Sequence, residues 1–328
     1  MNFTYLGIFY LFFLLLSIYI SKKLSFFDLP NKRKLHKKKI VNTSGVTFYL
    51  FLFILITNFE ISYEIEEITF LGFLVVACGF LDDQKELTPG VKLILILIPV
   101  IYLINKGYFL DDLGEYELIG KIYLGKFSFL FTLLACGLLI NSYNYVDGID
   151  GLLLGIFIIG ICYLCILNQD ENFLIFCKIL LIPTFINIIF NFIPNYSFKI
   201  LMGDGGSLFI GFLIGFLLII NYKIYNVHPA FLIWVCWYPV YDFLYVTIFR
   251  IKNKINFYKP DNIHFHHIVL KYVKNSHLKA SFLIYSLNII IILLGYYITL
   301  HVGKIYSLIS FMLFFIFFSL LRYFVRNI

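Results

Sequence analysis

The sequence predicts an all-α integral membrane protein, a polytopic helical bundle with about eleven transmembrane helices. Of its 328 residues, 61% are hydrophobic and only 14% are charged, whereas a soluble domain is roughly 45–50% apolar and about 25% charged. The apolar residues form runs long enough to cross a bilayer, and most basic residues lie between alternate runs. This composition excludes a cytosolic enzyme, a secreted disulfide scaffold, a disordered chain and a nucleic-acid-binding module.

The spans follow from the thickness of the membrane. A hydrocarbon core about 30 Å thick requires about 20 apolar residues per helix, within a range of roughly 17–25. We expect the spans at residues 4–21, 44–59, 66–81, 91–105, 127–140, 152–167, 173–190, 207–221, 229–249, 280–298 and 304–321. The chain is then one transmembrane domain over residues 1–328, with its polar motifs in loops near 82–92, 141–151, 191–207 and 250–279.

Basic residues set the orientation. No Lys or Arg precedes the first span, which argues against a cleaved signal peptide. Eight follow it: Lys22, Lys23, Lys32, Arg33, Lys34, Lys37, Lys38 and Lys39. The positive-inside rule makes this loop cytoplasmic, so that the N-terminus is outside and the C-terminus is inside. We expect the protein in the inner (plasma) membrane. Most of its 26 Lys and Arg residues and all four polar motifs then lie on the cytoplasmic face.

The first polar motif is the pair Asp82-Asp83 at the end of the third span. A helix C-terminus carries partial negative charge and favours cations, so that two adjacent carboxylates there are unfavourable unless something compensates them. The pair indicates a metal-linked or proton-accepting site. The alternative is a solvated helix end before the turn at Pro89 and Gly90.

The second motif joins the fifth and sixth spans and contains no Lys or Arg. If the stretch Asp147 to Asp150 is helical, the two carboxylates are i,i+3 neighbours on one face. Asn144 lies one turn before Asp147. Such oxygen ligands suit Mg²⁺ or Mn²⁺ rather than Zn²⁺. The alternative is a plain turn.

The third motif, Met202-Gly203-Asp204-Gly205-Gly206-Ser207, opens the eighth span. Ser207 is a candidate helix N-cap, and a helix N-terminus binds anions through its free N–H groups. An Asp among them suits a metal that bridges to phosphate. Glycine-rich turns also occur without such a function.

The fourth motif places three histidines, His264, His266 and His267, within four residues of a basic loop. Phosphate donors, a zinc site or a solvated loop could each explain them. No Cys lies nearby, and the acids elsewhere favour a hard metal over zinc. Asp242, inside the preceding span, is expected either in the site or as an ion-pair partner of Arg250 or Lys252.

Together the four motifs resemble the polyprenyl-phosphate N-acetylhexosamine-1-phosphate transferase superfamily, glycosyltransferase family 4. The resemblance covers roughly residues 22–277 and agrees with eleven spans. The box from His264 to His267, H-x-H-H, is closer to the GlcNAc-1-phosphate branch than to the three consecutive histidines of the muramoyl-pentapeptide branch.

The resemblance implies a magnesium-dependent phosphoglycosyltransferase, with Mn²⁺ as an alternative cation. A polyprenyl phosphate such as undecaprenyl phosphate would attack the β-phosphorus of a UDP-N-acetylhexosamine. The products would be UMP and a polyprenyl-diphospho-sugar that initiates a cell-envelope glycan. Its partners are therefore the UDP-sugar, the prenyl phosphate and the bilayer, and a homodimer stays open.

The resemblance also implies roles for individual residues. Asp82 and Asp83 would be catalytic acids, one of which accepts the proton of the prenyl phosphate, and Asp147 would support the reaction beside the metal. Asp204 and Asn144 would hold Mg²⁺. Asp150 would face the uracil. The other substrate-binding residues would be Lys92, Asn141, His264, His266 and His267.

Three alternatives remain from the sequence. A phospho-N-acetylmuramoyl-pentapeptide transferase, or a transferase for another UDP-sugar, would use the same motifs. A secondary transporter would place its acids near the midplane on broken helices, often with internal repeats, whereas these acids lie at the inner boundary. A non-catalytic scaffold for glycan assembly would not need every motif position to be filled.

Overall fold

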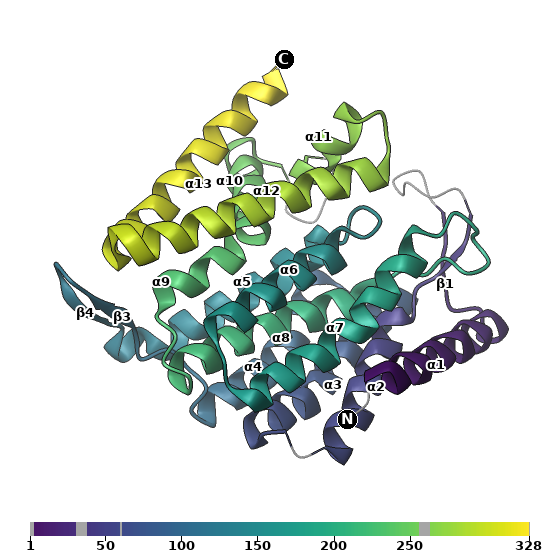
Figure 1. Ribbon diagram of the computed structural model, residues 1–328. Helices are drawn as coiled ribbons and strands as arrows, with labels where there is room; N and C mark the ends of the chain where they lie inside the picture. Colours follow the sequence, from purple (N-terminus) through teal and green to yellow (C-terminus); the bar gives the residue numbers. More distant parts are fainter. Residues whose placement is uncertain (1–2, 31–37, 60, 256–262, 328) are drawn as a thin grey trace.

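The computed structural model is a single bundle of helices (Figure 1). It describes residues 3–30, 38–59, 61–255 and 263–327. Part of the basic first loop, including Lys32, Arg33, Lys34 and Lys37, lies outside the described residues. The same holds for segment 256–262, which precedes the histidines.

The helices follow the predicted spans closely. Every segment predicted to cross the membrane is helical over most of its length. The helices are α1 (Phe3–Leu24), α2 (Ser44–Asn58), α3 (Tyr63–Gln84), α4 (Pro89–Asn105), α5 (Ser128–Val146), α6 (Leu152–Leu167), α7 (Glu171–Phe192), α8 (Gly203–Lys223), α9 (Pro229–Leu232), α10 (Trp237–Lys252), α11 (Phe265–Tyr272), α12 (His277–Tyr297) and α13 (Lys304–Asn327). A short 3₁₀ segment, Ile233–Cys236, joins α9 to α10, and a π-helical turn, Ile298–Val302, extends α12.

Among the residues that the structure describes, seven helical stretches are long and apolar enough to cross a membrane. The shorter apolar helices α2, α4 and α6 accompany them. Large apolar side chains on α1 and α13, such as Phe12 and Phe317, are exposed on the outside of the bundle, as expected for surfaces that contact lipid. The chain is therefore a multi-pass membrane protein, while the count of eleven spans and the orientation of the termini stay predictions.

Two small sheets add to the helices within the described residues. β1 (Phe27–Asp28) pairs with β2 (Ile40–Val41), and β3 (Asp112–Tyr116) pairs with β4 (Gly120–Tyr123), both antiparallel. The sequence prediction was all-α because strands of two to five residues are too short for a period-2 pattern to stand out. The loop predicted at 250–279 likewise contains the short helix α11.

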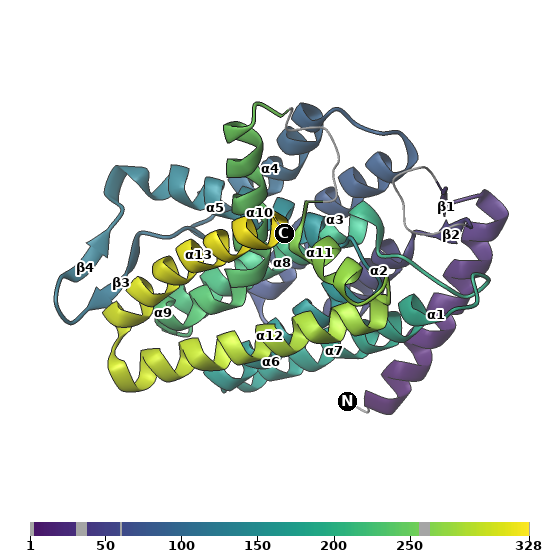
Figure 2. The ribbon, with the colours of Figure 1, turned by 90° about the horizontal axis from the view of Figure 1, so that it is seen from above.

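Helix α8 lies in the middle of the bundle and packs against α2, α3 and α5 (Figures 1 and 2). It is apolar on all sides after its first turn, which is typical of a fully buried helix. Two glycines allow its N-terminus to approach the neighbouring helices. A Cβ on Gly79 would overlap the backbone of Asp204, and one on Gly45 would overlap that of Gly206. The fold thus wedges the third polar motif between α2 and α3.

Candidate active site

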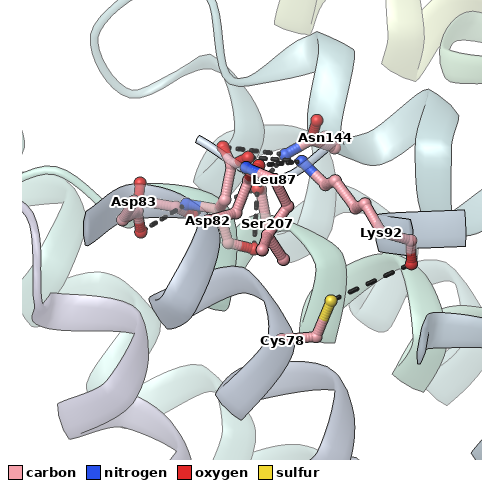
Figure 3. Close-up of polar contacts among 9 residues, drawn as sticks. Cys78, Asp82, Asp83, Leu87, Lys92, Asn144 and Ser207 are labelled. Atoms are coloured by element: carbon pink, nitrogen blue, oxygen red, sulfur yellow. Dashed lines mark hydrogen bonds and ion pairs between the residues drawn. The ribbon is translucent and has the colours of Figure 1, made fainter. Parts of the chain in front are cut away.

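Figure 3 shows a cluster of polar contacts that includes Asp82, Asp83, Lys92 and Asn144. Asp204, in the first turn of α8, is bonded to several of these residues. Gly203 before it has a φ of +67°, a conformation that favours glycine. The Asp204 carboxylate accepts hydrogen bonds from Lys92 Nζ and from Asn144 Nδ2, the latter at 3.1 Å. It therefore joins residues from α4, α5 and α8.

Lys92, in the first turn of α4, is shared between two carboxylates. Its Nζ lies 2.8 Å from Asp82 Oδ2 and also contacts Asp204. The other oxygen of Asp82 accepts the Leu87 N–H at 2.6 Å. One ammonium group therefore links the first polar motif to the third.

Asp83 serves as a cap for α8 from a different helix. Its Oδ2 accepts the backbone N–H of Asp204 at 3.0 Å (Figure 3). A carboxylate at a helix N-terminus is favourable because it satisfies free N–H groups and opposes the helix dipole. Ser207, predicted as the cap, instead lies inside the first turns, where its hydroxyl donates to Gly203 O. That prediction was wrong because the helix begins four residues earlier, at Gly203.

The last turn of α5 brings the second motif to the same place. Asn144 Nδ2 lies 2.8 Å from Ser207 Oγ, in addition to its contact with Asp204. Asn141, one turn earlier, donates to Gly137 O in its own helix at 2.8 Å. Asn144 therefore belongs to the cluster, while the hydrogen bond of Asn141 is local to α5.

The segment after α5 is a turn and not a helix. The helix ends at Val146, and Gly151 adopts a φ of +75°. The predicted i,i+3 helical pairing of Asp147 with Asp150 was therefore wrong, because the chain must reverse here to start α6. Burial, together with the negative charges of Asp204 and Asp150, raises the pKa of Asp147 to about 7.

Asp150 has two partners, one lysine and one histidine, that the sequence analysis did not identify. Lys199 Nζ lies 2.6 Å from Asp150 Oδ2, and His277 Nδ1 lies 3.1 Å from the same oxygen. Burial opposes ionisation of Asp150, but these two partners outweigh it and lower the pKa of Asp150. Lys199 and His277 stand outside any motif, so that only the fold could connect them.

The fourth motif packs on the second. The ring of His264 stacks on Tyr145, with centroids 5.1 Å apart, and on His266 at 5.5 Å. His266 in turn lies so close to Gly148 that a Cβ there would overlap its ring. The ring centroids of His266 and His267 lie 4.3 Å apart, so that His267 belongs to the same group.

His266 is buried, and both of its ring nitrogens are without a hydrogen-bond partner among the residues that the structure places. Burial and the neighbouring imidazoles lower the pKa of His266 well below its usual range, which keeps the ring neutral. Buried polar atoms are rarely left unpaired. Its position beside Gly148 therefore suits contact with a ligand.

Asp242 pairs with Arg322 and not with the predicted Arg250 or Lys252. Arg322 Nη1 lies 2.5 Å from Asp242 Oδ1, and His264 Nδ1 lies 2.7 Å from Asp242 Oδ2. Arg322 comes from α13, which passes beside α10 in the fold (Figure 2). Sequence proximity suggested the wrong partner because Arg250 and Lys252 lie in the last turn of the same helix, at least two turns beyond Asp242.

A sequence model described as glycosyl transferase family 4 matches residues 67–222, a stretch that contains Asp82, Asp83, Lys92, Asn144 and Asp204. Over this stretch the chain is similar to glycosyl transferase family 4. The match to the family ends before Asp242 and the three histidines, so that their arrangement is known here from the structure.

Curated relatives agree with this family. The chain is 28% identical over 275 residues to a probable undecaprenyl-phosphate N-acetylglucosaminyl 1-phosphate transferase of Bacillus subtilis, covering 83% of this chain and 76% of the relative. Undecaprenyl-phosphate alpha-N-acetylglucosaminyl 1-phosphate transferases of Yersinia pestis and Escherichia coli K12 are 27% and 26% identical, covering 81% and 79% of this chain and 75% and 73% of theirs. The GlcNAc-1-phosphate branch predicted from the four motifs is therefore confirmed.

Proposed function

We propose that the protein transfers a sugar-1-phosphate from a UDP-N-acetylhexosamine, in the first place UDP-GlcNAc, to undecaprenyl phosphate. The observation that carries this proposal is the meeting, at the N-terminus of α8, of Asp82 from α3 and Asp204 from α8 around Lys92, with the Asn144 amide from α5 bonded to Asp204. The names of the relatives supply the acceptor and the sugar. The product would initiate a cell-envelope glycan.

The proposed reaction exchanges one bond at phosphorus. A phosphate oxygen of the prenyl phosphate forms a bond to the β-phosphorus of the UDP-sugar, and the bond from that phosphorus to the oxygen of UMP breaks. Phosphoryl transfer depends mainly on positioning and on neutralising negative charge. Asp82 or Asp83 accepts the proton of the prenyl phosphate, and Lys92 supplies positive charge next to Asp82.

The donor set fits a magnesium ion. Within the described part of the chain, no three His, Cys, Asp or Glu side chains form a ready metal cage. Mg²⁺ does not need one, because it is usually held by one or two carboxylates together with water and substrate phosphates. Asp204 and Asn144 would hold it, with Asp147 nearby. When bound, it would neutralise charge on the diphosphate and on the leaving UMP.

Asp150 is proposed to bind the uracil. Its carboxylate is held by Lys199 and His277, and Ser281 Oγ donates to its backbone carbonyl at 2.7 Å. A side chain fixed in this way can present a defined acceptor to a base edge without losing freedom on binding.

The histidines are proposed to hold the diphosphate or the sugar. His266 offers two unpaired ring nitrogens in the part of the chain that the structure describes, and a neutral imidazole has one donor and one acceptor. A phosphate oxygen or a sugar hydroxyl would satisfy the donor. His264 and His267 flank it, and Tyr145 connects the group to Asn144 in the chain.

The basic loops support a site for this reaction on the cytoplasmic face of the plasma membrane. A UDP-sugar is soluble, and a prenyl phosphate lies in lipid, so that the site must lie at the boundary between the two. The carboxylate cluster lies at the C-terminal end of α3 and the N-terminal end of α8, and α8 is long and apolar enough to cross a membrane, which suits such a boundary.

The direct test incubates the purified protein in lipid nanodiscs with undecaprenyl phosphate, Mg²⁺ and radiolabelled UDP-GlcNAc. We expect label in the butanol-extractable lipid and an equal amount of released UMP. EDTA should abolish both, and excess Mg²⁺ or Mn²⁺ should restore them. Transfer that continues in EDTA would refute the metal role.

A panel of UDP-sugars, including UDP-GalNAc and UDP-N-acetylmuramoyl-pentapeptide, determines the sugar. Asp111→Asn serves as a matched control for substitutions of the motif aspartates and should keep wild-type transfer. This exposed aspartate pairs with Lys223, far from the motifs. Absence of transfer from every UDP-sugar, with folded protein, would contradict the proposed function.

A further inference from the structure

Helices α10, α11 and α13 meet around one buried carboxylate, that of Asp242, which is 1% exposed. Its Oδ1 accepts from Arg322 Nη1 at 2.5 Å and from the Phe265 N–H at 2.8 Å. Its Oδ2 lies 2.7 Å from His264 Nδ1. Both oxygens are thus committed, and the carboxylate is an acceptor for a cation, an amide and an imidazole at once.

Arg322 is as deeply buried as its partner, at 1% exposure. Its Nη2 donates to the carbonyl of Ile263, and its guanidinium lies 4.0 Å from the centroid of the Tyr245 ring. A buried arginine is costly unless it is paired and hydrogen-bonded on several sides. Its contacts with Asp242, Ile263 and Tyr245 hold Arg322 in place. The positive charge of Arg322 keeps the Asp242 carboxylate ionised and therefore a hydrogen-bond acceptor.

This arrangement determines how His264 is held. Because a carboxylate paired with arginine accepts hydrogen bonds, Nδ1 of His264 carries the proton, and Nε2 is the nitrogen left for other contacts. The two stacking contacts, with Tyr145 and with His266, fix the plane of the ring. The backbone bond from Phe265 to Asp242 anchors the start of α11 as well.

We propose that Arg322 and Asp242 are positioning residues, which hold His264 in one tautomer and one orientation so that its Nε2 meets the substrate diphosphate. The proposal rests on the transferase function proposed above. It assigns a role to α13, a helix that lies outside the stretch matched by the family. Neither residue touches the substrate in this scheme; both act through His264.

The test uses a neutral double variant, Asp242→Asn with Arg322→Gln, which leaves no unpaired buried charge and so favours folding. We expect kcat to fall by about 10- to 100-fold and KM for UDP-GlcNAc to change by less than about 3-fold. The single variant Arg322→Lys keeps the charge but loses the planar fork, and should lie between wild type and the double variant.

The decisive comparison repeats the double change in a His264→Asn background. If the pair acts through His264, its removal should lower kcat by less than about 2-fold there. An equal loss in both backgrounds would show a structural role and overturn the proposal, as would wild-type kcat in the double variant. A wild-type protein without any transfer would instead refute the proposed function.

A second measurement does not depend on activity. ¹⁵N-labelled histidine spectra should show one ring protonated at Nδ1 in the wild type, and this signal should be lost in the double variant and in His264→Asn alone. An unchanged signal would overturn the proposal. Ser307→Ala is the matched control on α13, since Ser307 is buried and bonded to Trp234 and Thr299; it should lower thermal stability and leave kcat and the spectra unchanged.

Discussion

Two carboxylate sites, the buried Asp112 in the β3–β4 hairpin and the half-buried cluster at the N-terminus of α8, differ in how their charges are balanced. In the hairpin cluster, Asp112 of β3 accepts from the Tyr222 hydroxyl, from Lys121 at 2.9 Å and from the Gly114 N–H at 2.9 Å. Burial opposes ionisation, but these bonds outweigh it and lower the pKa of Asp112. The single carboxylate of Asp112 is therefore balanced by one lysine and by two further hydrogen-bond donors.

The cluster at the N-terminus of α8 contains more acid than base. Asp82, Asp83 and Asp204 are joined by contacts to one lysine, Lys92, or to one another's backbone, and Asp147 adds a fourth charge close by. Uncompensated buried charge is costly. Burial and ion pairing alone therefore do not indicate a functional site. An excess of carboxylates over cations does, because the surplus negative charge requires a further cation or a proton.

The largest difference between the two sites is expected when one carboxylate is removed from each. Asp204→Ala and Asp83→Asn should each lower kcat by at least about 100-fold, the usual size of a single catalytic contribution. The measurement is single-turnover transfer of label from UDP-GlcNAc. Asp83→Asn also tests the cap of α8, so that its thermal stability should be recorded in parallel.

Asp112→Ala is the matched control from the hairpin cluster. It should lower the unfolding temperature and change kcat of the folded protein by less than about 2-fold, since the loss leaves Lys121 and Tyr222 unpaired but touches no substrate. Full activity in Asp204→Ala, or a large loss of turnover in Asp112→Ala, would reverse the distinction between the clusters.

The dependence of magnesium affinity on pH is a second test of the surplus negative charge at the N-terminus of α8. With a pKa of about 7, Asp147 holds a proton below that pH and adds a negative charge above it. Because the cation competes with this proton, the Mg²⁺ concentration for half-maximal rate should fall by up to about tenfold per pH unit as pH rises toward 7, and then level off. Magnesium titrations across this range measure the effect, and Asp147→Asn should flatten it. A constant magnesium requirement in the wild type would argue against Asp147 as part of the cation site.

The smallest effect is expected where acid and base are again balanced, at Asp150. Lys199→Gln or His277→Asn should raise KM for UDP-GlcNAc by about 5- to 20-fold, because a loosened Asp150 must be ordered on binding. The kcat should change by less than about 3-fold. Lys223→Gln, which removes the partner of Asp111, is the control with the same chemistry. An effect confined to kcat would place Asp150 with the reacting groups instead of the uracil.

Most of the helices and the residues of the cluster could be predicted because polar residues are conspicuous in so apolar a chain. Asp82, Asp83, Asn144 and Asp204 stand at the ends of apolar runs, and alternating spans bring such ends to one side of a bundle. The structure adds that they touch. Their catalytic and metal roles stay predictions that the experiments above address.

The partners of individual side chains could not be predicted, because they depend on packing between distant helices. Arg322 and Asp242 are 80 residues apart, and no periodicity connects α13 to α10. Lys199 and His277 carry no motif around them. Ser207 looked like a helix cap because the glycines before it resembled a loop, but in the structure Gly203 already begins α8, and a carboxylate from α3 takes over the capping.

That borrowed cap has a consequence for biosynthesis. The two ends of the bond between Asp83 and the Asp204 amide are 121 residues apart, so that at a synthesis rate of about 5–20 residues per second the ribosome needs on the order of ten seconds to supply the second end. During that interval Asp82 and Asp83 lack their partners in α8, while Lys92, the cation that pairs with Asp82, is already present. The carboxylate cluster is therefore complete only once α8 has been made, and His264 and Arg322 follow still later in the chain. A polypeptide terminated before them lacks part of the proposed site.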